Sequence, residues 1–323
     1  MLDTLVHNGV VRRVAQSVFT LFGVAVVVFV VLRAIPGDQI TANLGTEAAA
    51  LTPDQRAALE SYYGLDQPLL TQFFGWLGNI LTGNLGFSAR AQTSVADLTL
   101  QALPVTFELA VLSILLALVI GIPLGMLSAS RPNSARDATG QVVGLAGLSV
   151  PAFLLATTLT SVLASRFGFN PNGEPFARFF DDPLLNLQQM LLPSLVLGFG
   201  VAAPILRTTR TAVLEVASDD FVRTARAKGV PARRLQIRHV LRNALVPIAT
   251  MTGLQFGYLL GGAVVVEQIF SIPGIGRQVL LGIQQNEYAL VQSTVLVIAL
   301  AFVLVNLLTD LLYRIIDPRV RAA

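Results

Sequence analysis

Residues 109–130, LAVLSILLALVIGIPLGMLSAS, decide the fold class of this chain. The stretch contains no Asp, Glu, Lys or Arg. At ~1.5 Å of rise per helical residue it is long enough to cross the ~30 Å hydrocarbon core of a bilayer. Because water is absent there, the backbone N–H and C=O groups must pair within the segment, as they do in a helix. The stretch therefore predicts a transmembrane helix.

The composition of the whole chain agrees with a membrane protein. Of 323 residues, 54% are apolar and 13% are charged, against roughly a quarter charged in ordinary soluble domains. This balance excludes most soluble enzymes and a disordered chain. The absence of cysteine excludes disulfides, thiolate nucleophiles, zinc fingers and iron–sulfur clusters, and only His7 and His239 could supply imidazole ligands. We therefore expect no catalytic residue, no metal site and no nucleic-acid partner.

Five further runs resemble the first in length and lack of charge. We expect an all-α integral membrane protein, with a single transmembrane domain over residues 1–323 and six transmembrane helices. The expected spans are residues 14–32, 106–130, 138–165, 184–206, 243–266 and 288–309. A seventh charge-free run, 67–89, is interrupted by glycine and amide residues, and its apolar spacing instead predicts an amphipathic helix from Pro68 at the membrane interface, with Trp76 at that depth.

The basic residues orient the six spans. Six spans place both termini on one side, and sixteen of the 22 Lys and Arg residues then fall on that side. By the positive-inside rule, both termini are predicted to be cytoplasmic. Residues 33–105 then form an extracytoplasmic region, and residues 207–242, which hold nine of the basic residues, form a cytoplasmic one.

The extracytoplasmic region should have structure of its own. Thr52 and Gln55 are spaced for a capping box around Pro53, which predicts a helix from Pro53 to about Tyr63, ended at Gly64. The region is either a structural cap on the helices or a docking platform for an external partner. The residues leave both interpretations open.

The cytoplasmic region is predicted to contain a short, well-delimited helix. Ser218, followed by Asp219 and Asp220, provides a capping hydroxyl and two acids for a helix start, and Gly229 can adopt the left-handed stop. Pro231 then begins a second helix. Such a rod at the surface either docks a partner or tethers the chain to anionic lipid headgroups.

Two acids at the ends of spans are candidates for the translocation path. Glu108 is either a carboxylate at headgroup depth or part of the pathway. Glu267 precedes the apolar segment 268–277, in which Pro273 and Gly274 imply a sharp turn. This segment is either a re-entrant turn against the helices or a plain turn.

ATP-binding chemistry is missing from the sequence. A phosphate-binding loop needs lysine followed by Ser or Thr, but the one lysine, Lys228, precedes Gly229. The interiors of the spans also lack the ionisable residues expected in many secondary transporters.

A series of short motifs then resembles one family along residues 35–321: the permease subunits of binding-protein-dependent ABC importers, in the branch for dipeptides, oligopeptides and nickel. The motifs are IPGD at 35–38, YGLDQP at 63–68, GNLG at 83–86, TFEL at 106–109, GIPLG at 121–125, SVPAF at 149–153, RTARAKG at 223–229, PGIG at 273–276, NL at 306–307, DL at 310–311 and DPR at 317–319. The resemblance is specific because these motifs occur together, in order and at matching topological positions.

The resemblance implies that the short cytoplasmic helix is the coupling helix that sits in a groove of an ATPase subunit. Its residues are Asp220, Phe221, Arg223, Thr224, Ala225, Arg226, Lys228 and Gly229. The pathway or outer gate would involve Glu108, Glu267, Phe270, Pro273 and Gly274. The implied partners are a second homologous permease, two ATPases that bind ATP and Mg²⁺, an extracytoplasmic substrate-binding protein and the bilayer of a bacterial plasma membrane.

The sequence departs from the wider superfamily at the coupling helix, where Arg223 and Thr224 replace Glu and Ala of the usual Glu-Ala-Ala triplet, as is common in the peptide branch. Import of dipeptides or oligopeptides is the predicted function. Nickel, glutathione or another small solute is the alternative, and an ATP-independent secondary transporter or a structural scaffold is a different class of alternative.

Overall fold

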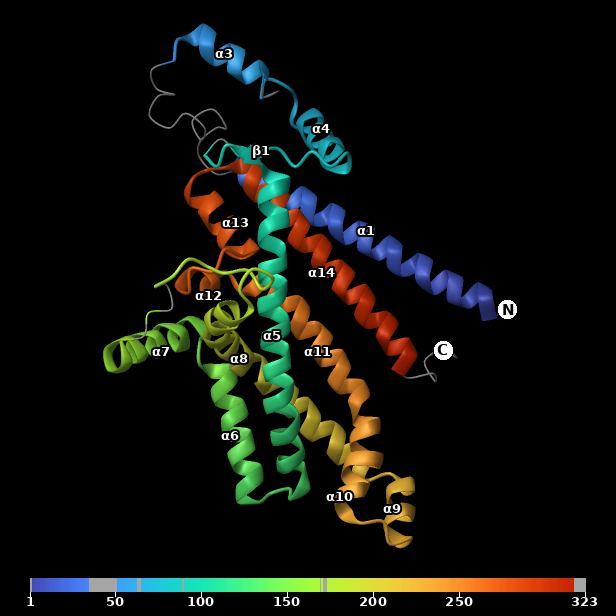
Figure 1. The fold of residues 1–323 in the computed structure, drawn as a ribbon. Coiled ribbons are helices and arrows are strands. Elements are labelled where there is room, and N and C mark those ends of the chain that lie inside the picture. The colour runs from blue at the N-terminus through green and yellow to red at the C-terminus, as the bar shows by residue number, and fades with distance from the viewer. Residues whose placement is uncertain are drawn as a thin grey trace. The chain divides into compact units, whose positions relative to one another are not determined.

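Figure 1 shows the computed structural model, which describes residues 2–34, 51–62, 65–88, 90–168, 170 and 173–316. Contacts along the chain divide the protein into two compact units, and the single transmembrane domain stays a prediction. The first comprises residues 1–106 and 273–303, and the second residues 107–272 and 304–323. The division arises because residues 273–303 associate with the N-terminal third of the chain. The motifs at 35–38 and 317–319, and Tyr63 and Gly64, lie outside the described residues.

The first unit is built mainly from helices. It contains α1 (Leu2–Ala34), α3 (Pro53–Tyr62), α4 (Leu69–Leu81), β1 (Phe87–Ser88), β2 (Thr93–Ser94), the start of α5 (Val95–Ser130), α13 (Ile275–Gln284) and most of α14 (Tyr288–Ile316). The two short strands pair antiparallel, with Phe87 opposite Ser94. This hairpin is a small departure from the expected all-helical fold.

The predicted capping box of α3 is confirmed. The Thr52 N–H donates to Gln55 Oε1 at 3.0 Å, and the Gln55 N–H donates to Thr52 Oγ1 at 3.3 Å. The predicted amphipathic helix is also present as α4, which packs on α1 through the buried ring of Phe73. That ring meets Phe22 and Phe29 edge-on, with centroid distances of 5.9 and 5.2 Å.

Leu85, Ser88 and Arg90, which precede α5, are hydrogen-bonded to residues at the start of α14. The buried Ser88 hydroxyl contacts both carboxylate oxygens of Glu287, at 2.8 and 2.9 Å. The Arg90 N–H donates to the same carboxylate, and Ser293 Oγ donates to the Leu85 carbonyl at 2.7 Å. These bonds hold this part of the chain against the start of α14, and the two interpretations of the region predicted to be extracytoplasmic, a structural cap and a docking platform, both stay predictions.

The second unit holds the remaining helices. They are the rest of α5, α6 (Ala135–Ser149), α7 (Ala152–Phe167), α8 (Pro183–Ala217), α9 (Asp220–Ala227), α10 (Ala232–Arg234), a π-helix (Leu235–Leu241), α11 (Arg242–Gly262), α12 (Val264–Ile269) and the end of α14. The long helix α8 packs along both α6 and α11.

Glycines allow α5 and α6 to approach α8 closely. A Cβ added to Gly125 would lie 2.6 Å from Thr209 Cβ, and one added to Gly147 would lie 2.9 Å from Ala203 Cβ. Such contacts are too short for any side chain. Small residues of this kind are the usual means by which transmembrane helices bring their backbones together.

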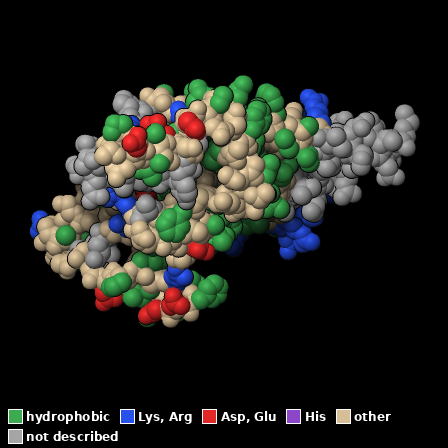
Figure 2. All heavy atoms as spheres, turned by 90° about the horizontal axis from the view of Figure 1, so that it is seen from above, with side chains coloured by type: hydrophobic (Ala, Val, Ile, Leu, Met, Phe, Trp, Pro, Cys, Tyr) green, Lys and Arg blue, Asp and Glu red, His purple; other side chains and the backbone are tan. Residues whose placement is uncertain are grey.

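Five helices of the described chain are long and apolar enough to cross a membrane, and α6 with α7 forms a further apolar pair bent by 95°. Large hydrophobic side chains reach the surface in many places, as the green spheres of Figure 2 show and as a bilayer requires. α4, with 13 residues, is a shorter apolar helix, as predicted. The cytoplasmic location of the termini stays a prediction from charge.

The expected span over 138–165 is not one straight helix. The chain leaves the helical conformation at Val150 (φ −83°, ψ 116°), immediately before Pro151, and α7 then starts at Ala152. Proline disfavours the helical conformation of the preceding residue and has no N–H for the helix ladder. Helices can also extend beyond the predicted spans: α5 begins at Val95, next to Ser94, whose Oγ accepts the Asp97 N–H at 3.0 Å.

A buried ion pair ties α6 to α8 at one end of the second unit. Asp137, whose side chain is 1% exposed, accepts two bonds from Arg210 at 2.7 and 2.8 Å. The same carboxylate accepts the Ser128 hydroxyl at 2.5 Å and the Asn133 N–H at 2.9 Å. One side chain therefore connects the end of α5, the following turn, α6 and α8.

We predict that Asp137→Asn lowers the thermal stability of the detergent-solubilised protein, because it leaves the Arg210 charge in place and removes its partner. The apparent Tm, measured by thermal shift, should fall by several degrees. Glu60→Gln, which breaks the exposed Arg56–Glu60 pair, is the control and should change the Tm little, since exposed pairs are worth ~0–1 kcal/mol. Equal effects of the two variants would contradict the central role of Asp137.

Candidate functional site

Residues at each end of the short helix α9 determine where it begins and where it ends. Its N-cap is Asp219, with Asp220 in the first turn, next to the positive end of the helix dipole. At the other end Gly229 adopts a left-handed conformation (φ 76°), as predicted. The Val230 N–H then donates to the Ala225 carbonyl at 3.2 Å, closing the helix with a glycine stop.

The predicted cap by Ser218 is wrong. Ser218 is the last residue of the turn that ends α8, and its hydroxyl donates to the Glu215 carbonyl at 2.7 Å. Because α8 continues to Ala217, the serine satisfies a carbonyl of the preceding helix rather than an N–H of α9.

One face of α9 is buried in an apolar cluster. Val222 is 1% exposed, and Ala225, three residues further along the same face, is half-buried. Their neighbours are apolar residues of α5, α8, the π-helix and α11. The buried members of the cluster are Ala129, Ala212, Val213, Val222, Leu235, Val240, Ala244 and Ile248. The cluster attaches α9 to the ends of α8 and α11, and Figure 1 shows α9 beside α10, next to the end of α11.

The remaining surface of α9 is exposed and mixed in character. Asp220 and Arg223 form an ion pair at 2.7 Å, although both side chains stay largely in solvent. The ring of Phe221 is 43% exposed beside them. Thr224, Arg226 and Lys228 are exposed as well. An aromatic ring within a polar, mostly basic rim is a composition typical of protein–protein contacts.

The link from α9 to α11 is helical almost throughout. After Gly229 and Pro231 come α10 and a seven-residue π-helix, which continues into α11 at Arg242. π-helical turns are rare and frequently lie at functional sites. The predicted arrangement of helix, glycine, proline and helix is thus present.

Glu108 lies on α5 within a network of amide side chains on α8. The half-buried Glu108 lies near the Asn186 side chain, with its Oε1 atom buried and without a hydrogen-bond partner among the described residues, and Asn186 Nδ2 donates to the Ala177 carbonyl at 3.0 Å. Gln189 Oε1 accepts the Ala177 N–H at 2.9 Å, while its Nε2 donates to the Pro175 carbonyl at 3.0 Å. Two amides of α8 therefore hold the loop before it in place.

Glu267 and Phe270 belong to the same unit as Glu108. Glu267 is fully buried in α12, which packs on α7 and α8, and Phe270 is 5% exposed after it. Phe270, Ser271 and Ile272 line a cavity of about 410 Å³ with residues 173–176 and Gln189. Glu108 is not among the residues that line this cavity.

Pro273 and Gly274 fall in the first unit, where Gly274 is the N-cap of α13. The Ile275 N–H of the first turn donates to the buried Thr106 hydroxyl at 2.8 Å. Ile272 and Ile275 are each 1% exposed. Burial on both sides of the proline contradicts a plain solvated turn and agrees with a turn packed against helices.

Several residues of these networks escape sequence reasoning. Asp137 and Arg210 are separated by 73 residues, so no local pattern pairs them. Asn186 and Gln189 are visible as amides in the first turns of an apolar span, a signal of buried polar contacts, but their partners depend on how the loop folds. Among the described residues, no group of three potential metal ligands occurs.

Comparisons with known proteins match nearly the whole chain. Residues 121–322 match the family described as the binding-protein-dependent transport system inner membrane component, and residues 6–110 match the N-terminal component of such systems. Relatives named glutathione transport system permease protein GsiC occur in Escherichia coli (strain CFT073), at 37% identity, and Pectobacterium atrosepticum, at 39%. Each alignment covers 97% of this chain and 99% of the relative.

Solved structures share the fold at low sequence identity. An inward-facing structure of the MetNI methionine ABC transporter matches with a TM-score of 0.54 and 17% identity, over 68% of this chain and 96% of that chain. An amino acid ABC transporter crystallised with histidines matches with a TM-score of 0.50 and 16% identity, over 69% and 94%. Likeness at this level concerns the fold alone.

We predict that Gly229→Ala loosens α9. An added Cβ meets no atom within 4 Å, so the cost is that of the left-handed backbone, ~1–2 kcal/mol. Amide hydrogen exchange of residues 220–228, followed by mass spectrometry, should therefore become about five- to thirtyfold faster.

The matched control is Gly75→Ala, which also adds a methyl to open space but at an ordinary helical position. It should leave the exchange of α9 unchanged and slightly stabilise α4. Unchanged exchange in Gly229→Ala would show that α9 does not depend on its glycine stop.

Proposed function

This chain belongs to the binding-protein-dependent inner-membrane permeases of bacterial ABC importers, and we propose that it is driven by a partner ATPase through α9. As a multi-pass inner-membrane permease subunit it is a translocation component and not itself the ATPase. Membership in the family removes the alternatives of a secondary transporter and of a scaffold.

The observation that carries the proposal is the two-faced geometry of α9. Val222 and Ala225 hold one face in the apolar cluster, while the other face stays open to a partner. A partner that grips the open face and moves therefore displaces the attached ends of α8 and α11. Such rigid-body movement of packed helices is a general form of switching in proteins.

The exposed face suits a groove that is apolar at its centre and acidic around it. Phe221 would fill the centre, because buried aromatic side chains dominate the energy of many interfaces. Arg223, Arg226 and Lys228 would meet acidic groups at the rim, where charges mainly steer and orient association. The coupling helix also includes Asp220 in its first turn, Thr224, whose hydroxyl donates to the Asp220 carbonyl at 3.0 Å, and Gly229 at its stop.

The complete importer that we propose contains a second homologous permease subunit, two ATPases and an extracytoplasmic substrate-binding protein. ATP and Mg²⁺ would be bound by the ATPases, and this chain would need no cofactor of its own. The excess of basic residues around α9 supports its location on the cytoplasmic side.

We also propose that Glu108 and the segment from Glu267 to Gly274 belong to the pathway or its outer gate. Support comes from the burial of Glu267 and Phe270 and from the cavity beside Phe270. The loop over residues 175–177, fixed to α8 by Asn186 and Gln189, closes one wall of that cavity.

For the imported solute, we propose a short peptide, with glutathione as the first candidate. The support is the similarity of this chain, along almost its whole length, to permeases named for glutathione transport. Glutathione is itself a tripeptide, so the proposal stays within the predicted peptide branch and is narrower than dipeptides and oligopeptides in general.

We predict that Phe221→Ala lowers ATP-driven uptake and solute-stimulated ATPase activity at least tenfold, since a truncated interface anchor typically costs over ~1.4 kcal/mol of binding. The partly exposed side chain can be removed without opening the apolar cluster. Both activities would be measured in proteoliposomes of the assembled importer. Phe19→Ala, which truncates a phenylalanine on α1 that is 78% exposed, is the control and should keep activity near wild type.

Ala225→Arg should abolish the same activities through the buried face, while membrane insertion persists because the change lies outside the spans. Full activity in both Phe221→Ala and Ala225→Arg would overturn the assignment of α9.

The solute proposal predicts saturable, ATP-dependent uptake of labelled glutathione by the importer reconstituted with its own binding protein. An excess of unlabelled glutathione should compete fully, and nickel ions should not compete. Uptake of nickel that is indifferent to glutathione and to dipeptides would contradict the proposal, without affecting the role of α9.

A further inference from the structure

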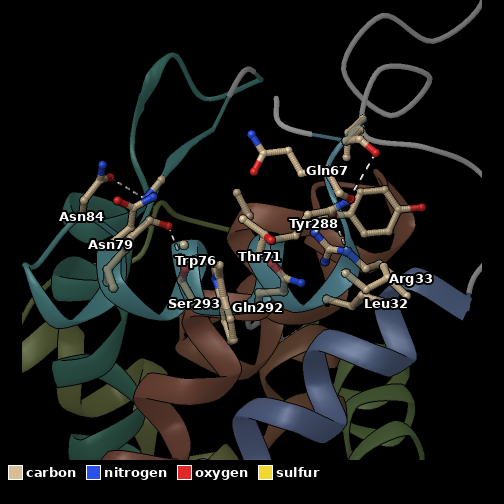
Figure 3. A pocket seen from close by; sticks show the side chains of 17 residues that line it. Leu32, Arg33, Gln67, Thr71, Trp76, Asn79, Asn84, Tyr288, Gln292 and Ser293 are labelled. Atoms are coloured by element: carbon tan, nitrogen blue, oxygen red, sulfur yellow. Dashed lines mark hydrogen bonds between the residues drawn. The ribbon is translucent and has the colours of Figure 1, made fainter. Parts of the chain in front are cut away.

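A polar pocket of about 590 Å³ lies in the first unit, where α1, α4 and α14 meet (Figure 3). α1 contributes Leu32 and Arg33 from its last turn, and α14 contributes Tyr288 and Gln292 from its first turns. α4 forms one wall, which includes Trp76. Neither the coupling helix nor the proposed gate forms part of this pocket.

The pocket holds hydrogen-bond donors that the protein itself leaves unused. Within the part of the chain that the structure describes, Trp76 Nε1 and Gln292 Nε2 are buried and have no acceptor. Gln292 as a whole is 6% exposed. Buried donors without partners are unfavourable and uncommon in native proteins, so two of them at one cavity indicate an acceptor supplied from outside.

Arg33 adds a positive charge whose orientation is fixed. Its Nε and Nη2 atoms both donate to Gln72 Oε1, at 3.0 and 2.9 Å. The guanidinium carbon also lies 3.7 Å from the centre of the Phe29 ring. Gln72 is in turn held by bonds from its Nε2 to the carbonyls of Leu65 and Gln67. A guanidinium has further N–H groups for another acceptor, and Arg33 remains open to solvent.

The described residues that line the pocket include no Asp or Glu. One oriented guanidinium, two neutral donors without partners and no acid, all within the described residues, are a lining that favours an anion over a cation. Phosphate oxygens match the planar fork of arginine especially well.

The position of the pocket along the helices identifies the source of the anion. Leu32 and Arg33 end the apolar segment of α1, and Tyr288 begins that of α14, so the pocket lies where two membrane-crossing segments end. The next layer of a bilayer is the headgroup region, in which Trp and Arg side chains are typically found. α4 also exposes Leu69 and Leu70, at 63% and 72%, beside the pocket, as a helix in contact with acyl chains would.

We propose that this pocket binds the phosphate headgroup of an anionic phospholipid, with Arg33, Trp76 and Gln292 as its donors. The bound lipid joins α1, α4 and α14 at their shared end. The role goes beyond the transport function and does not depend on the identity of the solute.

The test is lipid retention by the assembled importer, measured by native mass spectrometry. The importer is released from nanodiscs that contain equal amounts of phosphatidylglycerol and phosphatidylcholine. Wild type should retain phosphatidylglycerol in preference to phosphatidylcholine. Arg33→Gln should reduce that excess at least fivefold, and Gln292→Leu should also reduce it. Arg33→Lys keeps the charge but not the planar fork, so it should lose less of the excess than Arg33→Gln does.

Arg90→Gln is the matched control, because it removes an exposed charge from the same unit but outside the pocket. The Arg90→Gln variant should retain lipid as wild type does. Arg33→Lys and Arg33→Gln should have similar thermal stability, which would show that a loss of lipid in Arg33→Gln comes from the lost charge and not from unfolding. Equal retention in Arg33→Gln and Arg90→Gln, or no preference between the two lipids, would overturn the proposal. Displacement of the lipid by millimolar inorganic phosphate or by a short peptide would also overturn it, since either result assigns the pocket to a soluble anion.

Discussion

The close approach of helix backbones to α8 is the constraint on which the second unit depends. In hydrocarbon, helices gain little by burying apolar side chains against one another, so contact distance and shape decide their association. Gly125 and Gly147 let α5 and α6 reach α8 at distances that no side chain would permit. A helix held this tightly moves with its neighbours. Because α9 is attached to the end of α8, a displacement of α9 would move α8 together with the helices packed on it.

Polar side chains fasten the unit at both ends of that helix. Asp137 and Arg210 join α6 to one end of α8, and Asn186 and Gln189 fix a loop to the other. Asp137 and Arg210 meet across 73 residues of sequence, whereas the two amides bond backbone groups 9 to 14 residues before them. The apolar contacts determine how close the helices lie, whereas these polar bonds fix the position of the helix ends relative to α6 and the loop. An importer that alternates between two states needs both properties, because displacement must reach the spans without dissipating in loose loops.

Sequence-based predictions were right where the interactions join residues close together at one helix end, and they failed where two helices meet. The helix from Pro53 and the stop at Gly229 depend on neighbours within a few residues, and both are confirmed. Ser218 fails because two helices compete for one hydroxyl, and the residues alone do not say which helix wins. Pro151 is visible in the sequence as a possible helix break. A charge-free run, however, shows only that a segment is long and apolar, and it does not show whether the helix is straight. The run therefore predicts one span where the chain turns by 95°.

The sequence by itself determined that this chain is a membrane protein, which of its segments are long and apolar enough to cross a bilayer, and that basic residues gather around one short capped helix. Those properties follow from composition and local spacing, because a bilayer tests each segment separately for apolar length and for paired backbone groups. Only the tertiary structure decided which face of α9 is free, that Asp137 meets Arg210, and that Arg33, Trp76 and Gln292 surround one pocket. These are contacts between residues far apart in the chain. Their energies depend on the distance between the groups, on their burial and on the identity of the partner, none of which can be read from a local stretch of sequence.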